Sequence, residues 1–275
     1  MVKDEGRHIL FFDYSIWQLI LFFFIYGFLG WLQECVVILI KEKRLTNRGF
    51  LTGPICPVYS IGAFVILLIT TPFSNNLILV FLTGMIGTTL VEYTTSVLMD
   101  FTFKTKWWDY THHRFNYKGR ICLSSSLFWG VLSVVLTKFL HPYVVVKIVE
   151  KIPMGLLMYL CVFLIIIFIA DAIVSCITAV SMRKIVETAG RLKEQLTELT
   201  QQLSNNIIKV ELQKRISKTQ YEYDTLIERK NYGYKRLLRA FPKSRSYKFN
   251  EVLTELKIRL IKLKKGKTKD ERNLE

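Results

Sequence analysis

The sequence has few of the groups that hold metals, cofactors or nucleotides. Its five cysteines are dispersed without a C-x-x-C pair, and its histidines form no H-x-x-x-H pair, so zinc sites and disulfides are not expected. Gly266–Thr268 resembles the end of a phosphate-binding loop, but Ile261 stands where that loop has its first glycine. We therefore predict no metal, no cofactor and no nucleotide-binding motif. A metal site remains an alternative on residues near one predicted membrane face: Cys56, Cys122, His112 and His113.

Charge is also scarce in the first two thirds of the chain. Residues 1–182 carry 14 basic and 10 acidic side chains, whereas residues 183–275 carry 24 and 12. Half of the 275 residues are hydrophobic, although the formal net charge is +16. A soluble domain rarely combines these values, so we expect an apolar body followed by a basic, hydrophilic tail.

Apolar stretches of membrane-spanning length fill the first part. Five of them are long enough to cross about 30 Å of hydrocarbon. They lie near residues 16–40, 56–71, 77–99, 121–140 and 155–180. The prediction is an all-α polytopic membrane protein of about five transmembrane helices. Its parts are an extracytoplasmic arm (1–15), a transmembrane domain (16–182) and a basic cytoplasmic tail (183–275).

Lysine and arginine alternate between the two sides of these predicted spans. The arm has two such residues, and the four loops have four, none, five and two, before a tail with 24. Basic loops stay in the cytoplasm. The pattern therefore predicts a multi-pass protein of the inner, cytoplasmic membrane with its N-terminus outside and its C-terminus in the cytoplasm.

Three carboxylates lie inside predicted spans. Glu34 is six residues before the end of the first span and Glu92 is seven before the end of the third, which puts both about 9–11 Å below the cytoplasmic boundary. Asp171 is deeper, near the midplane of the fifth span. An intramembrane acid is costly and is usually functional. We predict a polar cavity open to the cytoplasm; the alternative is that each acid bonds a neighbouring hydroxyl or amide.

The two basic cytoplasmic loops carry further candidate residues. The first has two glycines and two prolines between residues 47 and 59, which predicts a rigid, turned backbone where the chain re-enters the membrane. The other basic loop, the third in the chain, has several different hydrogen-bonding side chains between residues 107 and 120. An aromatic anchor at the membrane surface would not need this variety. From these loops we add to the predicted cavity Arg48, Tyr59, Trp108, Asp109, Tyr110, Asn116 and Arg120.

Several motifs resemble one bacterial family, the CmpB-like membrane proteins named ABC-transporter type IV. The resemblance covers roughly residues 17–180 and implies a multi-pass, permease-like protein with a separate ATPase subunit. Ser60 stands where the family is expected to have glycine. The matching motifs are Gly30-Trp31 with Glu34, Asn47–Leu51 with Gly53-Pro54, Cys56-Pro57 with Tyr59, Glu92-Tyr93, Trp108–Tyr110, Phe115-Asn116, Gly119–Leu123, Ser126-Leu127 and Trp129-Gly130.

Two patterns mark the tail. Apolar residues alternate in steps of three and four from Ile185 to Val210, which predicts a coiled coil near 185–210. Such a seam would pair two copies of the chain, or pack within one tail against the amphipathic stretch that starts at Phe249. Residues 229–248 carry eight basic and no acidic side chains among interleaved aromatics, which predicts contact with anionic lipid. Nucleic acid is not expected, because no fold that presents these charges to it is visible.

These patterns together predict a transport-related protein, either permease-like or an accessory component. One alternative is a membrane-anchored scaffold that recruits partners through the coiled coil. Another is a lipid-active enzyme with Asp109 or Glu92 as the base and Arg48 and Arg120 on a phosphate, although no nucleophile–base pairing can be identified.

Overall fold

The structure is a computed structural model that describes residues 14–205, 209–228 and 232–259. The chain divides into two compact units. The first consists of Met1–Leu98 and Asp109–Ser175, and the second of Met99–Trp108 and Cys176–Glu275.

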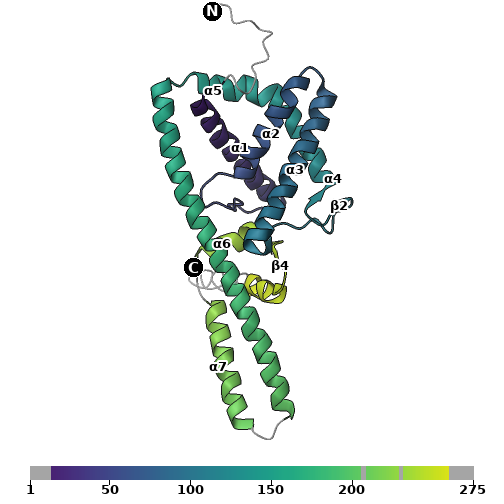
Figure 1. Cartoon of the computed structure of the whole chain (residues 1–275), viewed down its shortest axis with the longest axis vertical. Coiled ribbons are helices and arrows are strands. Elements are labelled where there is room, and N and C mark those ends of the chain that lie inside the picture. The colour runs from purple at the N-terminus through teal and green to yellow at the C-terminus, as the bar shows by residue number, and fades with distance from the viewer. Residues whose placement is uncertain (1–13, 206–208, 229–231, 260–275) are drawn as a thin grey trace, which may run out of the picture. The chain divides into compact units, whose positions relative to one another are not determined.

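Helices make up nearly all of both units (Figure 1). In chain order up to the long sixth helix, the elements are α1 (Ile16–Glu42), α2 (Pro57–Thr70), the 3-10 turn η2 (Thr71–Phe73), α3 (Leu77–Phe103), β1 (Thr105–Lys106), β2 (Asn116–Tyr117), β3 (Ile121–Cys122), α4 (Leu123–Val135), the π-helical η3 (Leu136–Val145), α5 (Val146–Glu150) and α6 (Met154–Asn205). Beyond it lie α7 (Lys209–Glu228), α8 (Tyr232–Ala240), β4 (Arg245–Ser246) and a helical stretch over residues 250–259.

Four helical segments in the described part of the chain are long and apolar enough to cross a membrane. They are Ile16–Lys41, Leu77–Phe103, Leu123–Glu150 and Met154–Leu203. The predicted all-α membrane class is therefore confirmed. The apolar helix α2, at 14 residues, extends only about 21 Å, which is short of the hydrocarbon thickness. The count of five spans thus stays a prediction.

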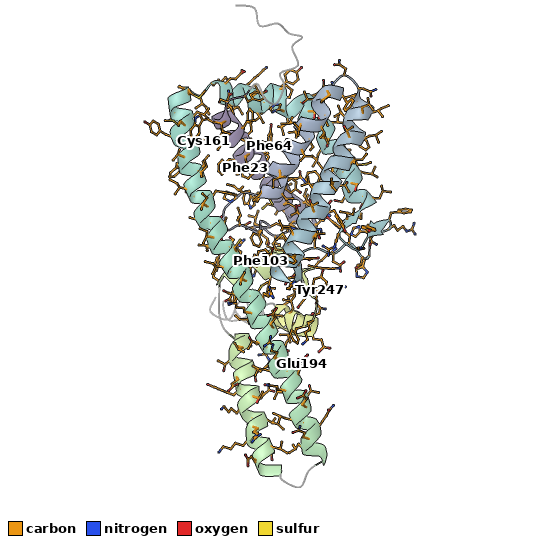
Figure 2. The ribbon with its side chains drawn as sticks, in the orientation of Figure 1. Phe23, Phe64, Phe103, Cys161, Glu194 and Tyr247 are labelled. Carbon is orange, nitrogen blue, oxygen red and sulfur yellow. The ribbon has the colours of Figure 1, made fainter. Side chains whose placement is uncertain are left out.

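Small side chains and aromatic rings set the packing of the first unit. A Cβ atom on Gly84 of α3 would lie 2.3 Å from the Cβ of Ser133 in α4, so these two helices meet almost backbone to backbone. Close approach at small residues is how membrane helices gain van der Waals contact. Phe23 of α1 packs edge-on against Phe64 of α2 and Phe168 of α6, with ring centroids 6.3 and 5.6 Å away (Figure 2).

Part of the predicted seam of the tail lies against the chain's own helices in the second unit, while its position 206 lies outside the described residues. The distal part of α6 and α7 run side by side (Figure 1) and line a groove of about 600 Å³, with Leu196 on α6 and Ile216 on α7. The ring of Phe249 lies on Gly190, where a Cβ would come within 2.1 Å of it. The amphipathic stretch that starts at Phe249 thus packs on α6, as the intramolecular alternative expected. Pairing of two chains stays a prediction.

The contact between α3 and α4 gives a direct test of this packing. Gly84→Ala should lower the free energy of unfolding by about 1–3 kcal/mol, because the added methyl overlaps Ser133. Gly155→Ala is the matched control, since nothing lies within 4 Å of its added Cβ, and stability should be unchanged or slightly higher. Reversible unfolding in mixed micelles measures both. Equal effects of the two variants would contradict close packing at Gly84.

Candidate functional site

The segment between α1 and α2 is a non-helical loop that packs against helices of the first unit. The amide of Cys56 donates to the carbonyl of Gly27, in the middle of α1, at 2.9 Å. Glycine at position 27 is required by this approach, because a Cβ there would lie 2.7 Å from Ile55 and from the hydroxyl of Ser60. Ser60 uses that hydroxyl to donate to the carbonyl of Phe23 at 2.7 Å. The serine that departs from the family pattern therefore has room and a partner.

Two polar side chains hold the outer part of the same loop. The Asn47 Oδ1 accepts from the Trp31 indole and from the Gly49 amide, both at 2.9 Å. Asp171 of α6 accepts from the amides of Thr52 at 3.0 Å and Gly53 at 2.7 Å. Backbone donors at membrane depth must be satisfied by protein or water. Asp171 therefore satisfies two backbone donors of the loop, and its place in a cavity stays a prediction.

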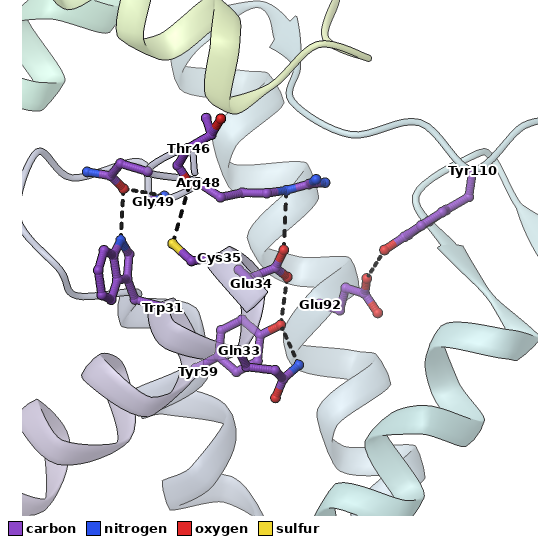
Figure 3. Close-up of polar contacts among 11 residues, drawn as sticks. Trp31, Gln33, Glu34, Cys35, Thr46, Arg48, Gly49, Tyr59, Glu92 and Tyr110 are labelled. Carbon is purple, nitrogen blue, oxygen red and sulfur yellow. Dashed lines mark hydrogen bonds and ion pairs between the residues drawn. The ribbon is translucent and has the colours of Figure 1, made fainter. Parts of the chain in front are cut away.

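This loop brings Arg48 to the first of the two glutamates. Arg48 Nε lies 3.2 Å from Glu34 Oε2, with each side chain less than one third exposed. The Tyr59 hydroxyl donates to Glu34 Oε1 at 2.7 Å, and Gln33 Nε2 donates to that hydroxyl at 3.4 Å (Figure 3). The negative charge of Glu34 is thus offset by a cation and a phenol, both contributed from outside its own helix.

Glu92 has a different environment. Its carboxylate accepts from the Tyr110 hydroxyl at 3.0 Å and from the Ser125 hydroxyl at 3.2 and 3.0 Å, and it also has a hydrogen bond with Trp129. The residue is buried, with 8% of its surface exposed. Ser125 lies in the first turn of α4, where the helix dipole favours negative charge. Every partner that Glu92 has in the described part of the chain is a neutral donor.

A short hairpin positions Tyr110. Strands β2 and β3 pair antiparallel, and Gly119 in their turn adopts a φ of 67°, the left-handed conformation that favours glycine. The Gly119 carbonyl accepts from the Tyr110 amide at 2.9 Å, while the phenol reaches Glu92 (Figure 3). Burial, followed by the charge of Glu92, raises the pKa of Tyr110 well above its usual value. The phenol therefore keeps its proton at neutral pH and donates a hydrogen bond to Glu92.

Trp129 joins the two carboxylate environments. Its ring packs on Tyr59 with the centroids 5.0 Å apart, while Trp129 also bonds to Glu92. The charge of Glu34 acts on Glu92 as well, so the two carboxylates lie within electrostatic range of each other. We name Glu34, Arg48, Tyr59, Glu92, Tyr110, Ser125 and Trp129 the carboxylate cluster. Because Arg48 offsets only one of the two glutamates, ionisation of both leaves one net negative charge.

The remaining predicted residues make contacts outside the carboxylate cluster, and their place in a cavity stays a prediction. Asp109 is buried and accepts from the Thr111 amide at 3.0 Å. Asn116 bonds within the hairpin loop, where it donates to the His113 carbonyl at 2.8 Å. Arg120 donates to Ser96 at 3.4 Å, and Trp108 belongs to the second unit. The groove of about 600 Å³ is also in the second unit, and neither glutamate lines it.

Sequence reasoning did not assign Ser125 and Trp129 to the site. Ser125 lies in a run of three serines at 124–126, and Trp129 enters the sequence analysis only as part of a family motif. The available signal was spacing: Ser125 and Trp129 are four residues apart, which puts them on one face of a helix that starts just after a basic loop.

One family model matches the chain. It is described as "Putative ABC-transporter type IV" and matches residues 21–176, more than half of the 275 residues. No curated protein and no solved structure matches the chain. The matched range contains the whole carboxylate cluster and ends before the distal part of α6. The chain is therefore a transport-related membrane protein that belongs to the ABC-transporter type IV family, as its sequence motifs implied.

Proposed function

We propose that the chain is the membrane-embedded component of an ABC-type transport system, permease-like or accessory, and that the carboxylate cluster is its polar site. The observation that carries this proposal is the environment of Glu92. Among the described residues its partners are all neutral donors, so the carboxylate, when ionised, carries a negative charge that no cation offsets, at a depth where charge is costly. The glutamine variants described below separate this role from a purely structural one, in which Glu92 only bonds the hydroxyls of Tyr110 and Ser125.

The site is proposed to take up one positive charge beside Glu92, either a proton or the cationic part of a substrate. The neutral donors and the N-terminus of α4 stabilise the empty, ionised state. Arrival of a positive charge then cancels the remaining negative charge of the cluster. In the predicted orientation, with basic loops in the cytoplasm, the cluster opens to the cytoplasmic side.

The ATPase of this proposed system would be a separate polypeptide. Family membership supports an ATPase partner, and the sequence itself has no phosphate-binding loop. The basic helical tail, outside the matched range, is available for such a partner.

Glutamine variants test the role of the cluster. The chain would carry an affinity tag and be extracted from native membranes with the proteins bound to it, and the complex would be reconstituted into vesicles. We expect an ATPase to copurify with the wild-type chain. Glu34→Gln and Glu92→Gln should each retain it but lower ATP hydrolysis by the complex at least tenfold, about 1.4 kcal/mol in activation free energy, because the charge of the site is altered. Mass spectrometry and a phosphate-release assay provide the measurements.

Glu198→Gln, at an exposed position of α6, is the matched control and should leave the rate unchanged. Three outcomes would contradict the proposal: no ATPase in the purified complex, rates of both cluster variants within twofold of the wild type, or failure of both variants to accumulate in the membrane. The last result would assign the glutamates to folding alone.

A double-mutant cycle separates stability from function at Glu34. Arg48→Gln should destabilise the protein, because Glu34 is then left without its cation. Adding Glu34→Gln should recover much of the loss, with a coupling of about 0.5–3 kcal/mol in the free energy of unfolding. ATP hydrolysis by the double variant should stay low, since the charges of the site are missing. Recovery of hydrolysis together with stability would show that the pair is structural.

A further inference from the structure

The end of α3 carries a group of cations drawn from two distant parts of the sequence. Its α-helix ends at Phe103, which is also the last residue of a candidate membrane span. Lys104 and Lys106 follow at once, and the turn after α8 adds three more basic residues. We name as the α3-end patch the five residues Lys104, Lys106, Lys243, Arg245 and Lys248, all of the second unit.

Backbone pairing holds these two segments together. Strands β1 and β4 are antiparallel, with Lys106 directly opposite Arg245. The Tyr247 hydroxyl donates to Asp100 Oδ2, in the last turn of α3, at 2.6 Å. Behind the strands, Trp107 is buried against Phe241, with their ring centroids 5.0 Å apart. The basic turn is thus fixed to the end of α3 at three points.

A half-buried lysine holds the turn from inside. Lys257, from the helical stretch 250–259, donates to the carbonyl of Pro242 at 3.0 Å and to the carbonyl of Ser244. Burial and then the positive charge of Arg245 lower the pKa of Lys257 to about 8. The turn is therefore a built structure in a positive local potential, and its outward cations are held in place.

The arrangement concentrates like charges on one surface. Opposed residues of an antiparallel pair project from the same face, so Lys106 and Arg245 repel each other. Lys243, Arg245 and Lys248 are exposed. Two nearby acids offset part of the charge, Asp100 at Tyr247 and Glu194, which lies 3.7 Å from Lys248. Among the described residues five cations thus lie near two acids, so a phosphate group that bridges the cations would be stabilised.

Exposed apolar side chains lie next to these cations, so one lipid could contact the cations with its headgroup and the apolar side chains with its hydrocarbon. Phe101, in the last turn of α3, is 73% exposed, and the Lys104 ammonium lies 4.9 Å from the centre of its ring. Lys106 lies likewise 5.8 Å from the centre of the Tyr247 ring, whose residue is labelled in Figure 2. Long cationic side chains that extend from an apolar span toward a polar layer are typical of the membrane boundary.

From these contacts we propose that the α3-end patch binds the phosphate headgroups of anionic phospholipids at the membrane surface. The occupant is a lipid because the patch begins one residue after a membrane-spanning helix and includes an exposed aromatic of that helix. The charge count places this surface on the cytoplasmic leaflet, which in cells carries anionic lipid. The inference is independent of the role proposed for the carboxylate cluster.

Lipid retention by the full chain tests the proposal. The protein would be reconstituted into nanodiscs of equal parts phosphatidylglycerol and phosphatidylcholine and released into the gas phase, where native mass spectrometry counts the lipids that remain bound. Wild-type protein should retain phosphatidylglycerol preferentially. Lys106→Gln with Arg245→Gln should lower that preference about tenfold or more, because each cation near the surface contributes to binding. The preference should also fall as salt is raised.

Two paired variants complete the test. Lys214→Gln with Lys218→Gln removes the same charge from exposed positions of α7 and should leave the preference unchanged. Lys106→Arg with Arg245→Lys keeps both charges and should preserve most of it, which separates charge from folding. An unchanged preference in the first variant, an equal loss in the α7 variant, or displacement of the lipid by millimolar inorganic phosphate or by a short RNA would each overturn the proposal.

Discussion

The loop between α1 and α2 lies against the middle of two candidate membrane spans, where its backbone polar groups must be satisfied by protein or water. A helix satisfies these groups internally, whereas residues 43–56 do not form one. The carbonyl of Gly27 and the carboxylate of Asp171 therefore accept from the loop amides. Only a loop fixed in this way delivers Arg48 to Glu34, so the ion pair depends on hydrogen bonds to Asp171, 137 positions further along the chain than Glu34.

Close helix approach is the second condition for the cluster. A Cβ on Gly30 would lie 2.2 Å from the ring of Tyr59, so α1 and α2 meet where the phenol must pass to reach Glu34. The glycine that permits the contact and the tyrosine that uses it are each ordinary residues in isolation. Gly30 gives the Tyr59 ring room to reach Glu34, which is a physical reason for a glycine and a glutamate to occur together in this motif of α1.

Sequence alone predicted the elements that depend on local pattern. Apolar runs located the long helices, and the cost of burying charge singled out Glu34 and Glu92. The pairing of Asp171 with the amides of Thr52 and Gly53 could not be predicted, because every residue except proline has such an amide. The tail shows the same limit: the heptad pattern predicts an apolar seam on α6, but that pattern is the same whether another chain or α7 covers it.

Glu34 and Glu92 lie at similar predicted depths in their helices. The residues that contact each of them are what distinguishes the two. Glu34 meets a cation on a loop, so a change in loop position changes its charge balance. Glu92 meets hydroxyls and an indole, which stabilise an anion but cannot neutralise it. Trp129 contacts both environments. The proposed binding of a positive charge needs a carboxylate without a fixed counter-ion, and among the described partners of the two glutamates only those of Glu92 meet that condition.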